Sequence, residues 1–178
     1  MRVRIETGLC KPVARVGCLL GAWLLVGCVG SLTPKTVSLQ ALEQAPPAAA
    51  QPVAHAVVAS ADTLRGLCTP LGPRLGLIQI RSVAEWTRLA RAAGLVQACP
   101  DLRRGMLVGL LCWAGTPVDG GAPIRIRSVH TKDGGGLLRA QFAGGSYLPD
   151  GTAYLDTEFV PDLNSVLAVD VNGTLFAP

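Results

Sequence analysis

Short apolar segments separated by glycine-rich turns fill most of residues 75–178. Met106–Trp113 is apolar throughout, which is typical of a central strand buried on both faces. From Ile124 onward apolar and charged residues alternate, as in a half-buried strand. Asn172-Gly173 is a typical two-residue hairpin turn between two further strand segments. These patterns predict a mainly antiparallel sheet of about six strands.

One segment has helical spacing instead. Ser82 and Glu85 form an S-x-x-E capping box, in which each side chain accepts a hydrogen bond from the other residue's backbone N–H. Trp86 and Leu89 follow at helical spacing, and Gly94 is a residue that commonly ends a helix. We expect this helix to pack on the sheet with Trp86 in the core, which gives an α+β fold with one packed helix.

The N-terminal residues have the pattern of a bacterial lipoprotein signal peptide. About a dozen mostly apolar residues precede Cys28, which is too few for a membrane-spanning helix. Leu25-Val26-Gly27-Cys28 fits a lipobox, and the basic region before it contains Arg2, Arg4, Lys11 and Arg15. The pattern predicts a signal peptide over residues 1–27, cleavage before Cys28 and acylation of its sulfur. An ordinary secretory leader cut at a nearby small residue is the alternative.

Acylation at Cys28 would make the lipid bilayer the first partner of this chain, because several acyl chains together hold a protein almost permanently at a membrane. We therefore expect the protein in the cell envelope. In a Gram-negative cell, Val29 after the cysteine favours sorting to the outer membrane, since it is not an aspartate retention signal.

The net charge of +4 belongs mostly to the leader. Residues 1–27 hold four of the sixteen Lys and Arg and one of the twelve Asp and Glu, so residues 28–178 carry +1. Because the remaining arginines are scattered and aromatic residues are few, the composition excludes a basic nucleic-acid-binding surface.

Residues 28–64 are rich in proline and alanine, and we expect them to form a solvated tether. Such a tether could hold the domain on the order of 50–100 Å from the bilayer. His55 lies in this segment with only alanine and valine beside it, which indicates a tether residue rather than a metal ligand. The folded domain is then expected over residues 65–178.

Three cysteines remain in the exported chain after Cys28. We expect a disulfide between Cys68 and Cys99, because an oxidising compartment favours one. Cys112 lies in the apolar strand segment and is expected to be a buried thiol. A zinc site on the three thiolates is the alternative, but the chain has no CxxC pair and no fourth ligand in view, so we expect no metal and no cofactor.

Four short motifs over about residues 75–178 resemble the PrcB C-terminal-type domain. They are Ser82-Val83-Ala84-Glu85-Trp86, Cys99-Pro100-Asp101-Leu102, Gly105-Met106-Leu107-Val108-Gly109 and the Gly120-Gly121 turn. Leu102 and Ala122 depart from the family, which usually has aromatic residues at these places. The resemblance implies a non-catalytic accessory module of a surface protease complex, and therefore an exported protein partner.

The sequence offers little for catalysis. His130 is the only histidine of the expected domain, and a hydrolase would have to combine it with Cys112 or Ser146. Asp156 and Glu158 share a strand face and could form a carboxylate pair or calcium site, but a solvated strand face is the simpler interpretation.

We therefore expect a non-enzymatic binding module. Its suspected contact residues are Gly120, Gly121 and Tyr147, in the turn 116–122 and the loop 144–151. A structural envelope lipoprotein and a small hydrolase are the alternatives.

Overall fold

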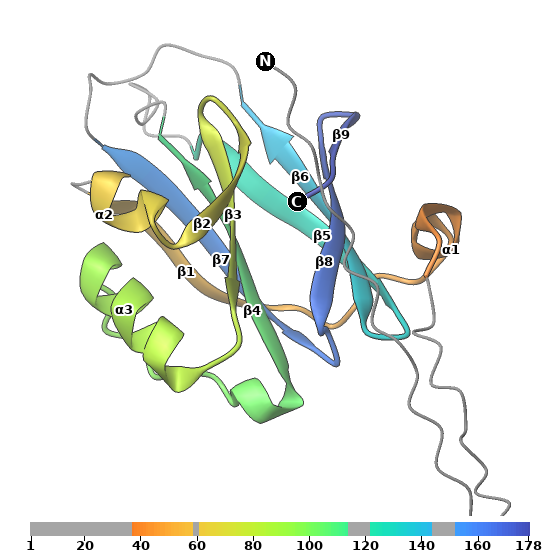
Figure 1. Ribbon diagram of the computed structural model, residues 1–178, viewed down its shortest axis with the longest axis horizontal. Helices are drawn as coiled ribbons and strands as arrows, with labels where there is room; N and C mark the ends of the chain where they lie inside the picture. The colour runs from red at the N-terminus through yellow and green to blue at the C-terminus, as the bar shows by residue number, and fades with distance from the viewer. Residues whose placement is uncertain (1–36, 59–60, 114–121, 144–151) are drawn as a thin grey trace, which may run out of the picture. The chain divides into compact units, whose positions relative to one another are not determined.

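Two β-sheets packed face to face form the centre of the computed structural model, which describes residues 37–58, 61–113, 122–143 and 152–178 (Figure 1). The five-stranded sheet has the order β1 (Gln51–Val58), β7 (Ala153–Pro161), β4 (Gly105–Cys112), β3 (Leu75–Ile80) and β2 (Cys68–Gly72), with all neighbours antiparallel. The four-stranded sheet has the order β5 (Ile124–Lys132), β6 (Gly135–Phe142), β8 (Ser165–Val171) and β9 (Thr174–Phe176). Only β6 and β8 are parallel neighbours among these strands.

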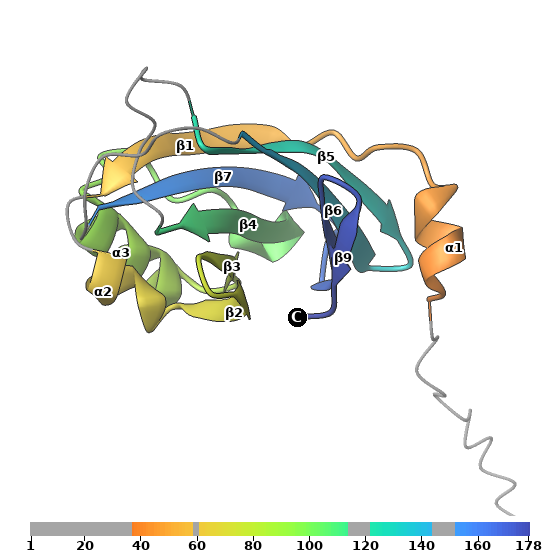
Figure 2. The same cartoon turned by 90° about the horizontal axis from the view of Figure 1, so that it is seen from above.

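Three α-helices cover the outer faces of the sheets in the described part of the chain. Helices α2 (Ala61–Arg65) and α3 (Val83–Ala93) lie on the five-stranded sheet, and α1 (Leu39–Glu43) lies on the four-stranded sheet (Figure 2). A 3₁₀ turn, η1 (Leu102–Arg104), leads into β4. The α+β class with mainly antiparallel sheet is confirmed, although the structure has two sheets and nine described strands rather than one sheet of about six.

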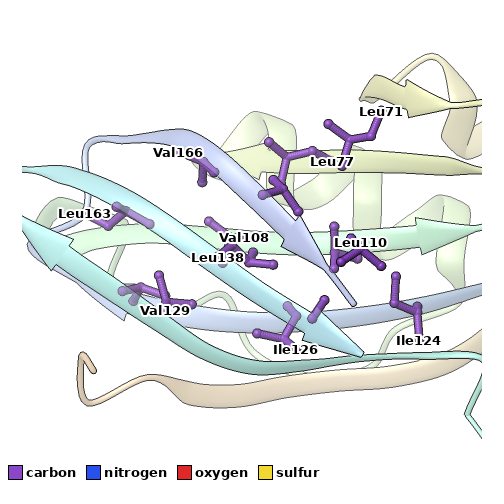
Figure 3. Close-up of a cluster of buried hydrophobic side chains, with 14 of the residues drawn as sticks. Leu71, Leu77, Val108, Leu110, Ile124, Ile126, Val129, Leu138, Leu163 and Val166 are labelled. Atoms are coloured by element: carbon purple, nitrogen blue, oxygen red, sulfur yellow. The ribbon is translucent and has the colours of Figure 1, made fainter. Parts of the chain in front are cut away.

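The main core fills the space between the two sheets. Alternate residues of β3 and β4, among them Leu77, Val108 and Leu110, meet Ile126 and Leu138 of the four-stranded sheet (Figure 3). A second apolar cluster lies on the other face of β4, under α2 and α3. Strand β4 is therefore buried on both faces, as its continuous apolar run predicted.

Helix α3 forms as its sequence predicted. Ser82 Oγ accepts from the Glu85 N–H at 3.2 Å, and Glu85 Oε2 accepts from the Ser82 N–H at 3.0 Å. Gly94 ends the helix with φ of 66°, the left-handed conformation that glycine adopts at least cost. Trp86 is 5% exposed and belongs to the cluster under the helix, which confirms it as a core residue.

The hairpin turn at Asn172-Gly173 also forms as predicted. Asn172 and Gly173 have φ of 51° and 84°, as a two-residue turn with positive φ at both central positions requires. The Gly173 N–H donates to Asp170 Oδ1 at 2.8 Å, which ties the turn to the end of β8.

The tether prediction is wrong for residues 37–58 and 61–64, because these residues contribute to α1, β1 and α2 of the same compact unit as the rest of the described chain. The small side chains that suggested a solvated linker instead suit close packing. Ala48 and Ala50 pack against the core between the sheets, and Ala54 of β1 is only 4% exposed. Leu42 of α1 is fully buried beside Leu137 and Ala168.

The segment that ends in β1 joins the two sheets along one side. Before β1, the Ala48 N–H donates to the Val129 carbonyl of β5 at 2.7 Å, and Pro47 forms an isolated antiparallel bridge with His130. The chain then leaves β5 and pairs with β7 in the other sheet, as Figure 2 shows. We call this side, formed by β1, β5 and β7, the seam.

A β-bulge in β1 is satisfied by a side chain of β7. The register shifts between Pro52 and Ala54, and the Thr157 hydroxyl then accepts from the Ala54 N–H at 3.0 Å and donates to the Ala54 carbonyl at 3.1 Å. Gly109 of β4 leaves room for Thr157, since a Cβ there would lie 2.7 Å from its methyl group. One buried hydroxyl thus replaces two ladder hydrogen bonds.

We predict that Leu42→Ala lowers the free energy of unfolding by about 2–5 kcal/mol, because it opens a cavity between α1 and the four-stranded sheet. Gln40→Ala changes an exposed residue of the same helix and is expected to have almost no effect. Urea unfolding of the two variants checks this. Equal stabilities would mean that α1 does not belong to the fold.

Candidate functional site

A basic pocket lies on the outer face of the four-stranded sheet, the face turned away from the five-stranded sheet. It has a volume of about 240 Å³. Its lining residues are Ala122, Arg125, Arg127, Gln141 and Ala143, and we call it the arginine pocket. Ile124 and Ile126 are buried in the core, so alternation along β5 turns Arg125 and Arg127 outward.

Two neighbouring strands fix the polar groups of the arginine pocket. Arg125 and Gln141 are cross-strand partners in β5 and β6. Arg127 stands at a register shift in β5, and its Nε donates to Gln141 Oε1 at 2.9 Å while its Nη2 donates to the same oxygen. Within the described residues, no carboxylate forms an ion pair with Arg125 or Arg127. Their guanidinium groups therefore suit an anionic partner group such as a carboxylate.

The two residues at the ends of the arginine pocket's lining stand next, in the sequence, to the segments that contain the suspected contact residues. Ala122 directly follows residues 114–121, which contain Gly120 and Gly121. Ala143 directly precedes residues 144–151, which contain Tyr147. Gly120, Gly121 and Tyr147 themselves lie outside the described residues, as do Cys28 and Ser146. The structure thus brings the ends of two chain segments together at one pocket.

His130 forms two hydrogen bonds on the same outer face. Its Nδ1 lies 2.7 Å from the Ala45 carbonyl oxygen, and its Nε2 lies 3.0 Å from Ser128 Oγ. A carbonyl only accepts, so Nδ1 carries a proton and, in the neutral ring, Nε2 accepts from the serine hydroxyl. The imidazole therefore holds the chain just after α1 against β5.

The surroundings of His130 decide which nucleophile a hydrolase could use. The hydroxyl within reach of His130 belongs to Ser128, which is neither of the two nucleophiles expected from the sequence, Cys112 and Ser146. Cys112 is fully buried in the core between the sheets, whereas His130 is on the outer face, so the two do not form a nucleophile–base pair. Neither Ser128 nor His130 lines the arginine pocket or any of three further pockets of the described residues.

Two carboxylates and an imidazole meet at the seam. Asp156 is 1% exposed, and its Oδ2 accepts from the Ile126 N–H of β5 at 2.7 Å. Its Oδ1 lies 2.5 Å from Nδ1 of His55 in β1. The expectation of a solvated strand face is therefore wrong for Asp156, and His55 is a strand residue at an ion-pair distance from a buried carboxylate.

Glu158 stands two residues further along β7, on the same face as Asp156. Burial raises the pKa of Glu158 to about 7, the Asp156 carboxylate also raises it, and His55 acts in the opposite direction. At neutral pH this half-buried carboxyl group is therefore partly protonated. No group of three or more His, Cys, Asp or Glu in the described chain is arranged to hold a metal ion.

The predicted disulfide between Cys68 and Cys99 is wrong. Cys68 Sγ donates to the Arg65 carbonyl at 3.3 Å, and Cys99 Sγ donates to the Pro100 carbonyl at 3.4 Å. Both residues pack against the apolar cluster under α2 and α3, so the thiols serve as small apolar groups there. Burial raises the pKa of each thiol, which lowers the thiolate fraction and so the reactivity.

The chain matches no protein-family model, no curated protein and no solved structure. The resemblance to the PrcB C-terminal-type domain therefore stays a prediction from four short motifs. In the described ranges, no helix has the length and apolar character needed to cross a membrane.

The cluster of His55, Asp156 and Glu158 at the seam could not be recognised from local sequence. His55 and Asp156 are 101 positions apart in the chain, and neither belongs to a motif. One signal was present: a strand with Leu155, Phe159 and Val160 around it carries two acidic residues on one face, which is unusual for a strand inside a packed domain.

We predict that stability falls as the pH rises from 4.5 to about 7, because folded Glu158 keeps a proton that the unfolded chain releases. Glu158→Gln stays neutral at every pH, so this part of the pH dependence disappears and the variant is more stable than the wild type above pH 7. Urea unfolding across the pH range measures both effects. Glu43→Gln, at an exposed position of α1, is the control, and identical slopes in all three proteins would contradict the prediction.

Proposed function

We propose that this chain is an exported lipoprotein, acylated at Cys28, whose folded unit binds an exported protein and catalyses no reaction. The observation that carries the binding role is the arginine pocket, where Arg125 and Arg127 are exposed on a rigid sheet face and have no carboxylate partner among the described residues. Arginine is enriched at the energetically dominant positions of protein interfaces. The proposed partner therefore presents an acidic group to this face.

The position of the arginine pocket supports the same function. Both suspected segments join the pocket, at Ala122 and Ala143. Glycine in one segment and Tyr147 in the other are residue types suited to a contact surface, since glycine permits close approach and tyrosine is common at interface hot spots. The resemblance to the PrcB C-terminal-type domain makes a surface protease complex the first partner to test.

A small serine hydrolase is the second candidate, favoured by one observation. Ser128 and His130 have the nucleophile–base distance, and the Ala45 carbonyl orients the imidazole. The binding role is preferred because the bond from His130 to the Ala45 carbonyl attaches the chain just after α1 to β5, and because the two side chains line none of the pockets described. Labelling by a fluorophosphonate probe that Ser128→Ala abolishes would favour the hydrolase.

We predict that Arg125→Ala/Arg127→Ala weakens capture of the partner by about thirtyfold or more, because even one hot-spot arginine contributes about 2 kcal/mol or more. The experiment captures the chain, tagged after Pro178, from lightly cross-linked envelopes and identifies the bound protein by mass spectrometry.

The matched control is Arg88→Ala/Arg91→Ala, which removes the same charge from exposed positions on α3. The control is expected to capture the partner like the wild type. Equal loss in both double variants would show that only net charge matters, and no loss in either would remove the arginine pocket from the proposal. Capture of cell-wall material alone would favour the structural lipoprotein.

We predict that Cys28→Ser abolishes incorporation of a palmitate analogue and releases the protein from the membrane fraction. Cys18→Ser is the control and is expected to keep both properties, because Cys18 has no apolar segment before it. Labelling of growing cells followed by fractionation measures both. Continued labelling of Cys28→Ser would show that Cys28 is not the acylated residue.

A further inference from the structure

An apolar groove separates α1 from the edge of the four-stranded sheet. Its volume is about 360 Å³. Val37, Leu39 and Leu42 line one side, and Leu167, Leu175 and Phe176 line the other. We call it the α1 groove. Among the described residues, no charged or polar side chain lines it, which distinguishes it from the arginine pocket on the same sheet.

The rim of the α1 groove exposes large apolar side chains. Leu175 is 51% exposed on β9, the short edge strand of its sheet, and Leu167 is 41% exposed on β8. Leu167 stands at a register shift between β6 and β8, where Gly136 pairs with Val166 and Leu137 pairs with Ala168. The extra residue is thus left out of the ladder, and its side chain lies over Gly135, where a Cβ would approach it to 2.7 Å.

The length of chain before the groove limits what can cover it. Val37 is a lining residue, and Cys28 precedes it by nine positions. Nine residues span at most about 30 Å when fully extended. If Cys28 is acylated, as the proposed function holds, the groove cannot move further than this from the bilayer surface. The bilayer is therefore present at a high effective concentration beside the groove.

We infer that the α1 groove rests against the bilayer that holds the acylated Cys28, with Leu167 and Leu175 in the interfacial region. The described lining carries no lysine or arginine, so the contact depends on apolar burial and not on anionic lipid. The folded unit is then docked on the membrane by one face. This inference rests on the proposed acylation and extends it to the orientation of the domain.

The experiment places a tryptophan at the rim and measures its contact with lipid. Leu175→Trp is made in the full acylated chain, which is reconstituted into phosphatidylcholine vesicles with brominated acyl chains. Val96→Trp is the matched control, because Val96 is a 95% exposed valine just after α3, on the opposite outer layer of the fold. The signals of the native tryptophans, among them Trp86 and Trp113, are subtracted with the wild-type protein.

The tryptophan introduced by Leu175→Trp is expected to lose at least about half of its fluorescence in brominated vesicles, since interfacial apolar side chains lie roughly 5–10 Å into the bilayer boundary. The tryptophan of the Val96→Trp control is expected to keep its fluorescence. Vesicles with and without anionic lipid should give the same result. Leu167→Trp, at a second rim position, repeats the test should Leu175→Trp disturb β9.

Two failures can be told apart. If the protein floats with the vesicles but both rim variants are quenched no more than Val96→Trp, the docking is overturned and the acylation stands. A blue-shifted but unquenched signal from Leu175→Trp would likewise overturn it, because a second copy or a protein partner then covers the groove. If the wild-type protein does not float and carries no acyl chain, both the proposed function and this inference fail.

Discussion

The carboxylate of Asp156 connects three strands that belong to two different sheets. It stands on β7, accepts a hydrogen bond from the Ile126 N–H of β5 and lies at an ion-pair distance from His55 of β1. A buried carboxylate is stable only where such partners surround it, so its place between the sheets depends on both neighbours. The preceding segment adds the Ala48–Val129 hydrogen bond. The seam therefore closes one side of the sandwich, and the chain before β1 is part of that closure.

This closure shortens the chain between the folded unit and Cys28, the expected site of acylation. Once residues 37–58 belong to the fold, nine positions and not thirty-seven separate Cys28 from the folded unit. The α1 groove and the arginine pocket both lie on the four-stranded sheet, the groove at β8 and β9 and the pocket at β5 and β6. A domain docked through the groove would thus present its arginines to a partner close to the membrane surface.

The part of the fold with strong local signals could be predicted from sequence. The capping box at Ser82, the apolar run of β4 and the turn at Asn172 act through neighbouring residues, and each forms as expected. Strand β1 could not be predicted, because its alanines give weak periodicity and its pairing depends on Thr157, far away in the chain. The contact of His55 with Asp156 and the bond of His130 to Ala45 are long-range for the same reason.

Hydrogen exchange of the seam amides tests this account most directly. The Ala48 and Ala54 N–H groups are bonded to Val129 and Thr157, on opposite sides of the crossing between the sheets. If the segment closes the sandwich, both amides exchange as slowly as those of β4, since they open only with global unfolding. Exchange at the rate of an unstructured chain, with β4 still protected, would contradict the account and return residues 37–58 to the role of a tether.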